Sequence, residues 1–417
     1  MNIGLPKGVK SFSPQETVQI EYIQKNISDT IEKWGYEKLY LPIFEYYEVH
    51  KKGIGDNLKN LTFRFVDRNE GDILTLRADF TAQIARYVAS LKEKEFPLRF
   101  YYNDDVYRYT YPKADKLWQI RQLGIELIGS DRYEADAEVI AIAVNSLKNL
   151  NIENFQIDIN NVAIFYSLKD LLNLTDKEFK TFMEFIKKRE IFNIKRFTSD
   201  RDIDEVLKEF VLNLPKYQGD INLIIDLKEK LSKFKSINKA LQKLIDIYQI
   251  LKEYNLTENI RFDLGEPKEF DYYTGLVFEI FIKDFKKPIG IGGRYDNLLS
   301  KFNGNIPATG FAFDIINLWQ YMKEKDLVSK SVFKDYFIID LTDNKKLAYK
   351  IGITLRKKGY KVGRDIVDRP LEESLNFAFK SGYKNVIVIG IEKNTERIHI
   401  YKNKKEFEIK NIEEILK

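Results

Sequence analysis

The sequence contains no cysteine and, in 417 residues, only two histidines, His50 and His399. Disulfide bonds and thiolate metal sites are therefore excluded, and two imidazoles are too few for a histidine-rich metal centre. There is also no run of about 18 apolar residues and no apolar stretch of signal-peptide length at the N-terminus. These absences predict a cytoplasmic protein without a metal, a cofactor or a membrane partner, whose chemistry depends on carboxylates, lysines, arginines and tyrosines.

The composition is that of a globular chain, with 44% hydrophobic and 14% aromatic residues. The length predicts two or three domains rather than one core. Charge is unevenly distributed: residues Ser331 to Lys417 include 19 basic and 13 acidic residues, net +6, and the remainder carries 49 basic and 50 acidic residues, net −1. A basic terminal module suits RNA or an acidic protein face, although lysine-rich surfaces are common in soluble proteins.

The first part of the chain predicts one helix followed by strands. Ser13 and Glu16 are spaced as a capping box, apolar residues recur at helical spacing after them, and Gly35 ends the pattern. Strand-like patterns follow in the segments YEKLYLPIFEYYEV, LTFRFVD, DILTLRAD, LRFYYNDDVYRY and WQIRQLGIELIG. A second helix is expected from Tyr133 to Leu147. Short loops and long hairpins between the strands favour a largely antiparallel sheet, and hence an α+β fold.

The second part predicts a helical insertion, a return to the sheet and a separate terminal domain. A lysine- and leucine-rich sequence with helical periodicity extends from about residue 165 to 255 within a core of residues 1–325. YYTGLVFEIFI reads as a strand, GIGGRYDNLL as a tight turn and ATGFAFDIINLWQYM as a helix. After the polar run EKDLVSK, residues 331–417 alternate between strand and helix patterns, as in a small α/β domain.

Four separated segments resemble the class II histidyl-tRNA synthetase family, and their order makes the combination specific. They are TLRADFTAQIAR, VYRYTYPKADKLWQIRQLGIELIG, FDYYTGLVFE and the pair GGRYDNLL and ATGFAFDIINL. The resemblance covers nearly the whole chain. It implies an antiparallel sheet flanked by helices, a homodimer made through the first helix and the strand near Pro42, and a C-terminal domain of anticodon-binding type.

The resemblance also implies a histidine pocket, in which carboxylates accept from the ammonium group and aromatic residues enclose the imidazole. Asp79 and Glu126 match the ammonium-binding acids, although Asp79 is one methylene shorter than the usual glutamate. Without the family context, an exposed strand carboxylate or a structural ion pair is the more common role for such residues, and one of the paired tyrosines is expected to pack in the core. The positions implied to bind histidine are Asp79, Thr81, Arg108, Gln122, Glu126, Lys268, Tyr272 and Tyr273.

Residues for ATP chemistry depart from the synthetase pattern. Arg108 matches the arginine of the second class II motif, but Thr110 stands where an acid is expected and Asn317 where the third motif has its arginine. Lys268 replaces the catalytic arginine and lacks its planar bidentate fork. Adenylate formation needs cations around the reacting phosphates, so we expect no catalytic residues here. The spacing of GIGGRYDNLL does not fit a phosphate loop, although Arg294 within it could reach the site.

A kept amino-acid pocket beside a degraded ATP site resembles the regulatory subunit of ATP phosphoribosyltransferase. LPKGVKSF, LRADFTAQIAR and GSDRYEADAEVIAIA are similar to that family. The resemblance implies a non-catalytic partner of the short-form catalytic subunit, which performs the first step of histidine biosynthesis, with histidine as feedback effector and a homodimer inside a larger hetero-oligomer. An active histidyl-tRNA synthetase is the alternative, and the terminal domain, absent from many regulatory subunits, favours it. A third hypothesis is a module that binds tRNA without charging it, and only the +6 segment favours that.

Overall fold

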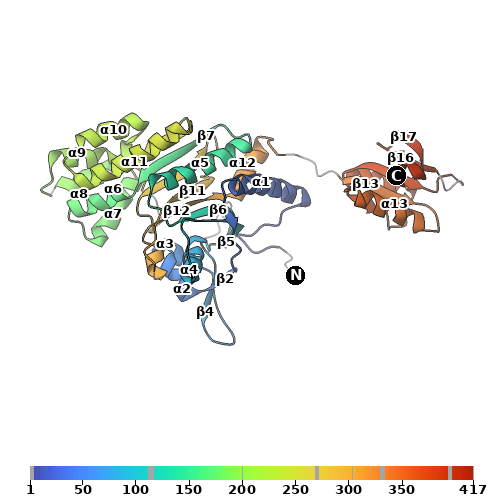
Figure 1. Ribbon diagram of the computed structural model, residues 1–417, viewed down its shortest axis with the longest axis horizontal. Coiled ribbons are helices and arrows are strands. Elements are labelled where there is room, and N and C mark those ends of the chain that lie inside the picture. Colours follow the sequence, from blue (N-terminus) through green and yellow to red (C-terminus); the bar gives the residue numbers. More distant parts are fainter. Residues whose placement is uncertain are drawn as a thin grey trace. The chain divides into compact units, whose positions relative to one another are not determined.

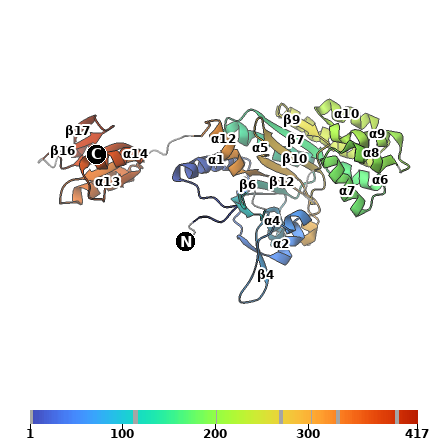
Figure 2. The same cartoon turned by 180° about the vertical axis from the view of Figure 1, so that it is seen from behind.

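The structure is a computed structural model that describes residues 4–110, 117–199, 201–267, 272–302, 304–328, 334–392 and 397–416. The chain divides into two compact units. One consists of Met1–Ser11 and Gln19–Leu327, and the other of Phe12–Val18 and Val328–Lys417. Figures 1 and 2 show the elements of each unit from opposite sides.

A sheet formed by nine strands of the described residues is the centre of the larger unit, in the order β1-β5-β6-β12-β11-β10-β7-β9-β8. Its pairs are antiparallel except for β1 with β5 and β7 with β9. The α+β fold and the largely antiparallel sheet predicted from the sequence are thus confirmed. The strands are β1 (Glu37–Lys38), β5 (Leu98–Tyr107), β6 (Gln119–Ile128), β7 (Phe155–Asn161), β8 (Gln218–Gly219), β9 (Ile260–Asp263), β10 (Leu276–Ile282), β11 (Gly290–Arg294) and β12 (Ala308–Asp314).

Helices α1 (Pro14–Glu32), α5 (Tyr133–Asn149) and α12 (Ile315–Glu324) cover one side of this sheet (Figure 1). The predicted capping box of α1 is present: Ser13 N donates to Glu16 Oε2 at 2.9 Å and Glu16 N donates to Ser13 Oγ at 3.3 Å. Gly35 has a φ of 79° just after the helix, a conformation that favours glycine. The start and the end of this helix are therefore both encoded locally.

A smaller sheet and three short helices lie beside the large sheet on its other side (Figure 1). The small sheet has the order β2-β4-β3 and is antiparallel. Its elements are β2 (Phe44–Tyr46), β3 (Arg64–Val66), β4 (Ile73–Leu76), α2 (Tyr47–Gly53), α3 (Asp56–Lys59) and α4 (Thr81–Ser90). The strand prediction is wrong from Tyr47 onward, because α2 begins there and buries His50 and Gly53 toward the core.

The lysine- and leucine-rich region folds into helices that pack on the end of the large sheet. They are α6 (Ala163–Leu171), α7 (Asp176–Lys187), α8 (Ile191–Ser199), α9 (Glu205–Asn213), η1 (Leu214–Lys216), α10 (Ile221–Lys230) and α11 (Lys235–Glu253). Helix α11 contacts α5, α6 and β7. Its leucines and isoleucines at positions 237, 241, 244, 247 and 251 are buried, so the repeated pattern in the sequence is one amphipathic face.

Two predictions between β10 and α12 are wrong. The glycines of GIGGR form β11 inside the sheet and not a tight turn. A Cβ at Gly292 would overlap the Phe311 side chain, and one at Gly293 would overlap the Leu276 carbonyl, so close strand packing explains both glycines. The segment expected to be wholly helical is strand β12 up to Asp314, whose side chain then caps α12 by accepting from Ile316 N and Asn317 N. Periodicity alone cannot separate strand from helix in a short apolar run.

The smaller unit contains a five-stranded sheet of the order β14-β13-β15-β16-β17, in which β14, β13 and β15 are parallel. Ile338 packs on the side of α13, and Phe337 and Ile339 pack on the side of α14, as alternation along a strand requires. The hairpin of β16 and β17 was not predicted. The elements are β13 (Lys334–Asp340), α13 (Lys346–Lys357), β14 (Val362–Arg364), α14 (Leu371–Lys380), β15 (Tyr383–Ile389), β16 (Arg397–Tyr401), β17 (Phe407–Asn411) and α15 (Ile412–Leu416). Within the described parts of both units, no helix is long and apolar enough to cross a membrane.

Candidate functional site

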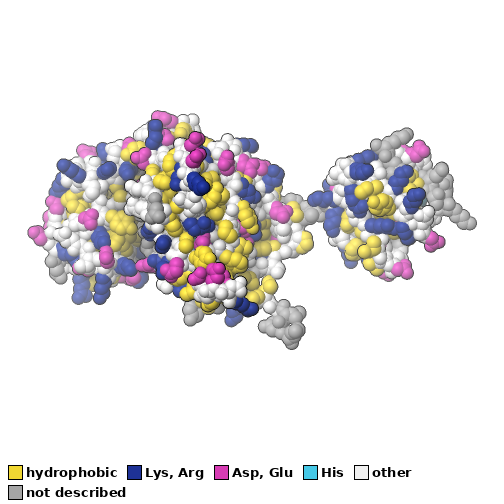
Figure 3. All heavy atoms as spheres, turned by 60° about the horizontal axis from the view of Figure 1, so that its bottom comes forward, with side chains coloured by type: hydrophobic (Ala, Val, Ile, Leu, Met, Phe, Trp, Pro, Cys, Tyr) yellow, Lys and Arg dark blue, Asp and Glu magenta, His cyan; other side chains and the backbone are white. Residues whose placement is uncertain are grey.

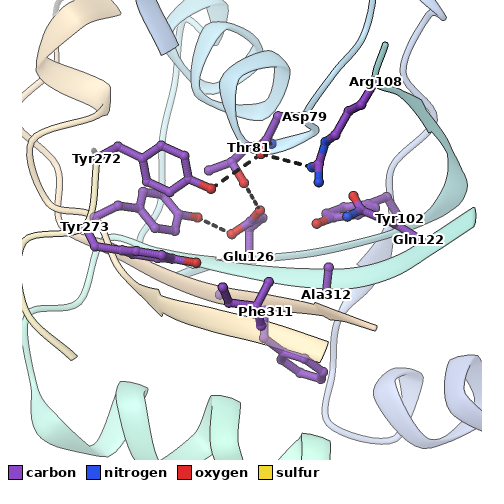
Figure 4. Close-up of a pocket in the computed structure, with 13 residues that line it drawn as sticks. Asp79, Thr81, Tyr102, Arg108, Gln122, Glu126, Tyr272, Tyr273, Phe311 and Ala312 are labelled. Atoms are coloured by element: carbon purple, nitrogen blue, oxygen red, sulfur yellow. Dashed lines mark hydrogen bonds and ion pairs between the residues drawn. The ribbon is translucent and has the colours of Figure 1, made fainter. Parts of the chain in front are cut away.

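A small cavity of about 40 Å³ lies between the large sheet and the start of α4, and Figure 4 shows the side chains around it. Seven of the eight residues predicted to bind histidine line this cavity, while Lys268 lies outside the described residues. The seven are Asp79, Thr81, Arg108, Gln122, Glu126, Tyr272 and Tyr273. The other lining residues are Tyr102, Ile291, Tyr295, Gly310, Phe311 and Ala312. The structure thus brings together residues from β5, β6, β11 and β12, from the start of α4 and from the approach to β10.

Glu126 is neither an exposed strand carboxylate nor half of an ion pair within the described part of the chain. It is 2% exposed, and its carboxylate accepts hydrogen bonds from Thr81 Oγ1 at 2.8 Å and from the Tyr295 hydroxyl. Burial raises its pKa to about 8, with a smaller contribution from nearby Asp79, against the lowering effect of the two hydrogen bonds. Gly310 stands directly across from Glu126 in the β12–β6 pair, and a Cβ there would overlap the carboxylate.

Asp79 is also buried, with 6% exposure. Its Oδ1 accepts from Thr81 N at 2.7 Å, and its Oδ2 lies 3.4 Å from the Tyr272 hydroxyl and 3.9 Å from Arg108 Nη2. The ion pair with Arg108 is long, so Asp79 keeps acceptor capacity toward the cavity. Two carboxyl groups therefore face a small space that contains one guanidinium.

Arg108 and Asp79 are tied to the same stretch of backbone. Arg108 Nε donates to Ala78 O at 2.9 Å, and Ala78 N donates to His50 Nε2 at 3.0 Å. Burial lowers the pKa of His50, which favours the neutral ring that can accept this bond. Sequence reasoning missed His50, whose only signal was its rarity.

The tyrosines form the wall opposite Arg108. Tyr272 lies with its ring centroid 5.0 Å from Tyr273 and 5.9 Å from Tyr295, the latter pair edge to face. Burial raises the pKa of Tyr272 and Tyr273 well above the usual value, so both hydroxyls stay protonated donors. One of the two was expected to pack in the core; both belong to the core cluster, and both also line the cavity.

A second cavity of about 420 Å³ also has Arg108 in its wall. Thr110 and Asn317, two of the departures from the synthetase pattern, line it together. Asn317 Nδ2 donates to Pro288 O at 3.2 Å, and among the described residues the buried Thr110 Oγ1 has no hydrogen-bond partner. The charged residues in the described wall are Arg108, Lys287 and Asp314, a net charge of +1 when ionised, and burial raises the pKa of Asp314.

Arg294 does not reach either cavity. It is 4% exposed, and its Nε lies 2.9 Å from Asp136 Oδ2 while its Nη1 lies 3.0 Å from Asp296 Oδ1. The suggestion that it could enter the pocket is therefore wrong. Arg294 instead takes part in a buried ion-pair network that joins β11 to α5. Removing one partner from such a network strongly destabilises the fold, because it leaves a buried charge uncompensated.

Comparison with known proteins defines the class to which this fold and pocket belong. A family profile described as histidyl-tRNA synthetase matches residues 8–318. A crystal structure from Bacillus halodurans, described as an ATP phosphoribosyltransferase regulatory subunit/histidyl-tRNA synthetase, has a TM-score of 0.80 and 28% identity, and the match covers 93% of this chain and 98% of that chain. Histidyl-tRNA synthetase from Nostoc has the same TM-score at 21% identity and shows the fold alone. The class is that of histidyl-tRNA synthetase-like proteins.

Relatives with higher identity carry two names. An ATP phosphoribosyltransferase regulatory subunit of Syntrophotalea carbinolica is 33% identical over 396 residues, 94% of this chain and 92% of that protein. One of Thermoanaerobacter is 36% identical over 360 residues, 86% of this chain and 93% of that protein. A histidine–tRNA ligase of Pyrococcus horikoshii is 32% identical over 405 residues, 94% of this chain and 92% of that protein. The chain belongs to the histidyl-tRNA synthetase-like family of ATP phosphoribosyltransferase regulatory subunits.

Proposed function

We propose that this protein is the non-catalytic regulatory subunit of ATP phosphoribosyltransferase, required for activity of the short-form catalytic subunit, and that histidine is its feedback effector. The observation that carries the proposal is the contrast between the two cavities. The small one keeps a complete set of groups for an amino acid. The described wall of the large one has a net charge of only +1, from Arg108, Lys287 and Asp314, which is little positive charge for a site that activates a triphosphate.

The residues around the small cavity match the groups of histidine one by one. Its ammonium faces Asp79 and Glu126, which are buried acceptors that a cation leaving water needs. Its imidazole lies among the tyrosine rings, where hydroxyl groups can pair with the ring nitrogens. The cavity is narrow and must widen to admit the ligand. Tyr272, 3.4 Å from Asp79, is the side chain whose movement would free that carboxylate.

The case against adenylate chemistry rests on Thr110 and Asn317. In the synthetase pattern the first position carries an acid and the second an arginine that holds ATP, whereas here the first offers a hydroxyl and the second a neutral amide already bonded to Pro288. A neutral amide brings neither the full positive charge nor the bidentate donors with which an arginine holds a reacting phosphate. Binding histidine without activating it is the activity that these residues support.

A homodimer is part of the proposal. Exposed apolar side chains surround the segment at Pro42, among them Tyr40 at 82% exposure, Ile43 and Phe44, and the outer side of α1 exposes Val18 and Tyr22. Figure 3 shows hydrophobic side chains gathered on the viewed face of the larger unit. Exposed apolar residues at this density favour association, and a two-fold dimer buries the same patch twice.

An active histidyl-tRNA synthetase is the second candidate, and one observation favours it. Relatives from Pyrococcus horikoshii and Methanocaldococcus jannaschii, named histidine–tRNA ligase, are 32% and 31% identical over more than nine-tenths of this chain. The deciding experiment adds the purified chain to a short catalytic subunit and measures phosphoribosyl transfer with and without histidine, beside an aminoacylation assay with tRNA. Stimulation of transfer without aminoacylation supports the proposal, and aminoacylation at ordinary enzyme rates would overturn it.

A further inference from the structure

The small pocket meets the large cavity at Arg108, which lines both. Figure 4 places Arg108 at one end of the small pocket and Tyr272 and Tyr273 at the other, with Asp79 and Glu126 between them. Arg108 is the one cationic side chain among the described residues of the small pocket. An amino acid whose ammonium faces the two acids therefore directs its carboxyl group to Arg108, at the entrance of the larger space.

The large cavity suits a group with an apolar part and at most one negative charge, since the charged residues of its described wall, Arg108, Lys287 and Asp314, sum to +1 when ionised. Its walls include the apolar side chains Leu58, Leu61, Ile120, Pro288 and Ile316. Near Arg108, the buried hydroxyl of Thr110 has no hydrogen-bond partner among the described residues, although a buried polar group normally has one. A carbonyl or an amide N–H of a ligand that extends past Arg108 would supply a hydrogen-bond partner for this hydroxyl.

We infer that the large cavity receives whatever is attached to the carboxyl carbon of the sensed amino acid, so that histidine amides and short peptides beginning with histidine are ligands. The inference rests on the proposed function, since it uses the same pocket for the ammonium and imidazole groups. The site would then recognise the free amino group and the side chain of its ligand, and it would tolerate substitution at the carboxyl group.

The expected affinity follows from two opposing changes. A peptide carbonyl still accepts from Arg108, but in a dipeptide the carboxylate charge is moved away from Arg108 to the second residue, which weakens binding by roughly 10-fold. An apolar second residue such as leucine enters a cavity with apolar walls, and its burial strengthens binding by roughly 10-fold or more. Histidyl-leucine should therefore bind within about tenfold of histidine.

The test is calorimetry on the full-length chain with histidine, histidyl-leucine and leucyl-histidine. The last ligand has the same composition, but its ammonium is displaced from the imidazole-bearing residue. Leu61→Trp, and independently Gln320→Trp on α12, place a large ring in the second cavity at positions that do not line the small one. Leu61→Met is the matched control because it keeps the side-chain volume, and unchanged histidine affinity shows that each variant is folded.

We expect histidyl-leucine to bind and leucyl-histidine not to bind. Each tryptophan variant should weaken histidyl-leucine at least about tenfold and leave histidine unchanged, and Leu61→Met should change neither. If histidine binds and histidyl-leucine does not, the inference is overturned while the proposed function stands. If the tryptophan variants bind histidyl-leucine as tightly as the parent chain, the substituent lies elsewhere and the inference is also overturned. If no ligand binds, the proposed function fails and the inference with it.

Discussion

Histidine binding should release a proton from Glu126. Burial raises the pKa of this carboxyl to about 8, so about nine in ten molecules carry it as the neutral acid at pH 7 before the ligand binds. An ammonium group is stabilised by the ionised carboxylate and not by the neutral acid. The ligand must therefore displace the proton, and the change that tests this is Glu126→Gln, which keeps the shape and removes the titration.

The size of the effect follows from the fraction of ionised carboxyl. With a pKa of about 8, this fraction rises roughly fivefold between pH 7 and pH 8, and the affinity of the parent protein should rise by the same factor. Glu126→Gln should bind histidine more weakly at pH 8, by roughly 10- to 150-fold, because a charge-assisted hydrogen bond is lost. Titration of the ligand itself affects both proteins equally, so the difference between them isolates Glu126.

Calorimetry in two buffers of different ionisation enthalpy measures the released protons directly. We expect close to one proton per histidine at pH 7 in the parent protein, and fewer in Glu126→Gln. Thermal unfolding gives an independent check. The unfolded carboxyl ionises near 4.5 and the folded one near 8, so its contribution to stability is complete below pH 4.5 and is lost as the pH rises toward 8 and above. The melting temperature of the parent should fall relative to Glu126→Gln over that interval.

Equal proton release in the two proteins, together with a parallel pH dependence of their affinities, would contradict this role of Glu126. That result would mean that Glu126 is already ionised in the ligand-free pocket or that the ammonium binds elsewhere.

Further predictions concern the other parts of the proposal. Asp79→Ala should weaken histidine binding about 10- to 150-fold and weaken feedback inhibition in parallel; intact inhibition despite weak binding would place the regulatory histidine elsewhere. The isolated chain should neither charge tRNA nor exchange pyrophosphate, because one lost charged contact to a reacting phosphate costs on the order of 100-fold, and radiolabelled assays measure both reactions. Light scattering should give a dimer for the chain alone and a larger complex with the catalytic subunit, and a monomer in both cases would contradict this. Deletion of Ser331 to Lys417 should leave a folded core that still activates the partner, since the described residues of that segment have their own apolar clusters; a folded but inactive truncation would assign the terminal segment to the assembly.

Local signals in the sequence predicted the elements whose ends are set by their own residues. Helix α1 is bounded by the Ser13–Glu16 capping box and by Gly35, and both can be read from residue type and spacing. The glycines of β11 could not be read in this way. They are required by Phe311 and Leu276, which come from neighbouring strands, and a single sequence does not give strand order.

In the candidate site, too, some features could be predicted from the sequence and others depend on contacts between distant segments. Asp79 and Glu126 were predicted through a family resemblance, but their environments were not. Glu126 owes its burial to Gly310 across the strand pair and its partners to Thr81 and Tyr295. These contacts join segments far apart in the chain, so no local pattern contains them. His50 is the extreme case, since a lone histidine in helix α2 gives no sign that it binds the backbone beside Asp79.

The bonds from His50 and Arg108 to the two sides of Ala78 have a consequence for stereochemistry. The Ala78 carbonyl that anchors the Arg108 guanidinium belongs to the peptide group that joins Ala78 to Asp79, so the backbone holds the Asp79 carboxylate and the guanidinium close together. A zwitterion whose ammonium and carboxylate are separated by one carbon atom matches a fixed spacing of this kind. A β-amino acid would present the same charges too far apart, and a D-amino acid that met both would point its side chain away from the tyrosines. The enantiomeric preference of the pocket would then originate in the backbone at Ala78, behind the residues that touch the ligand.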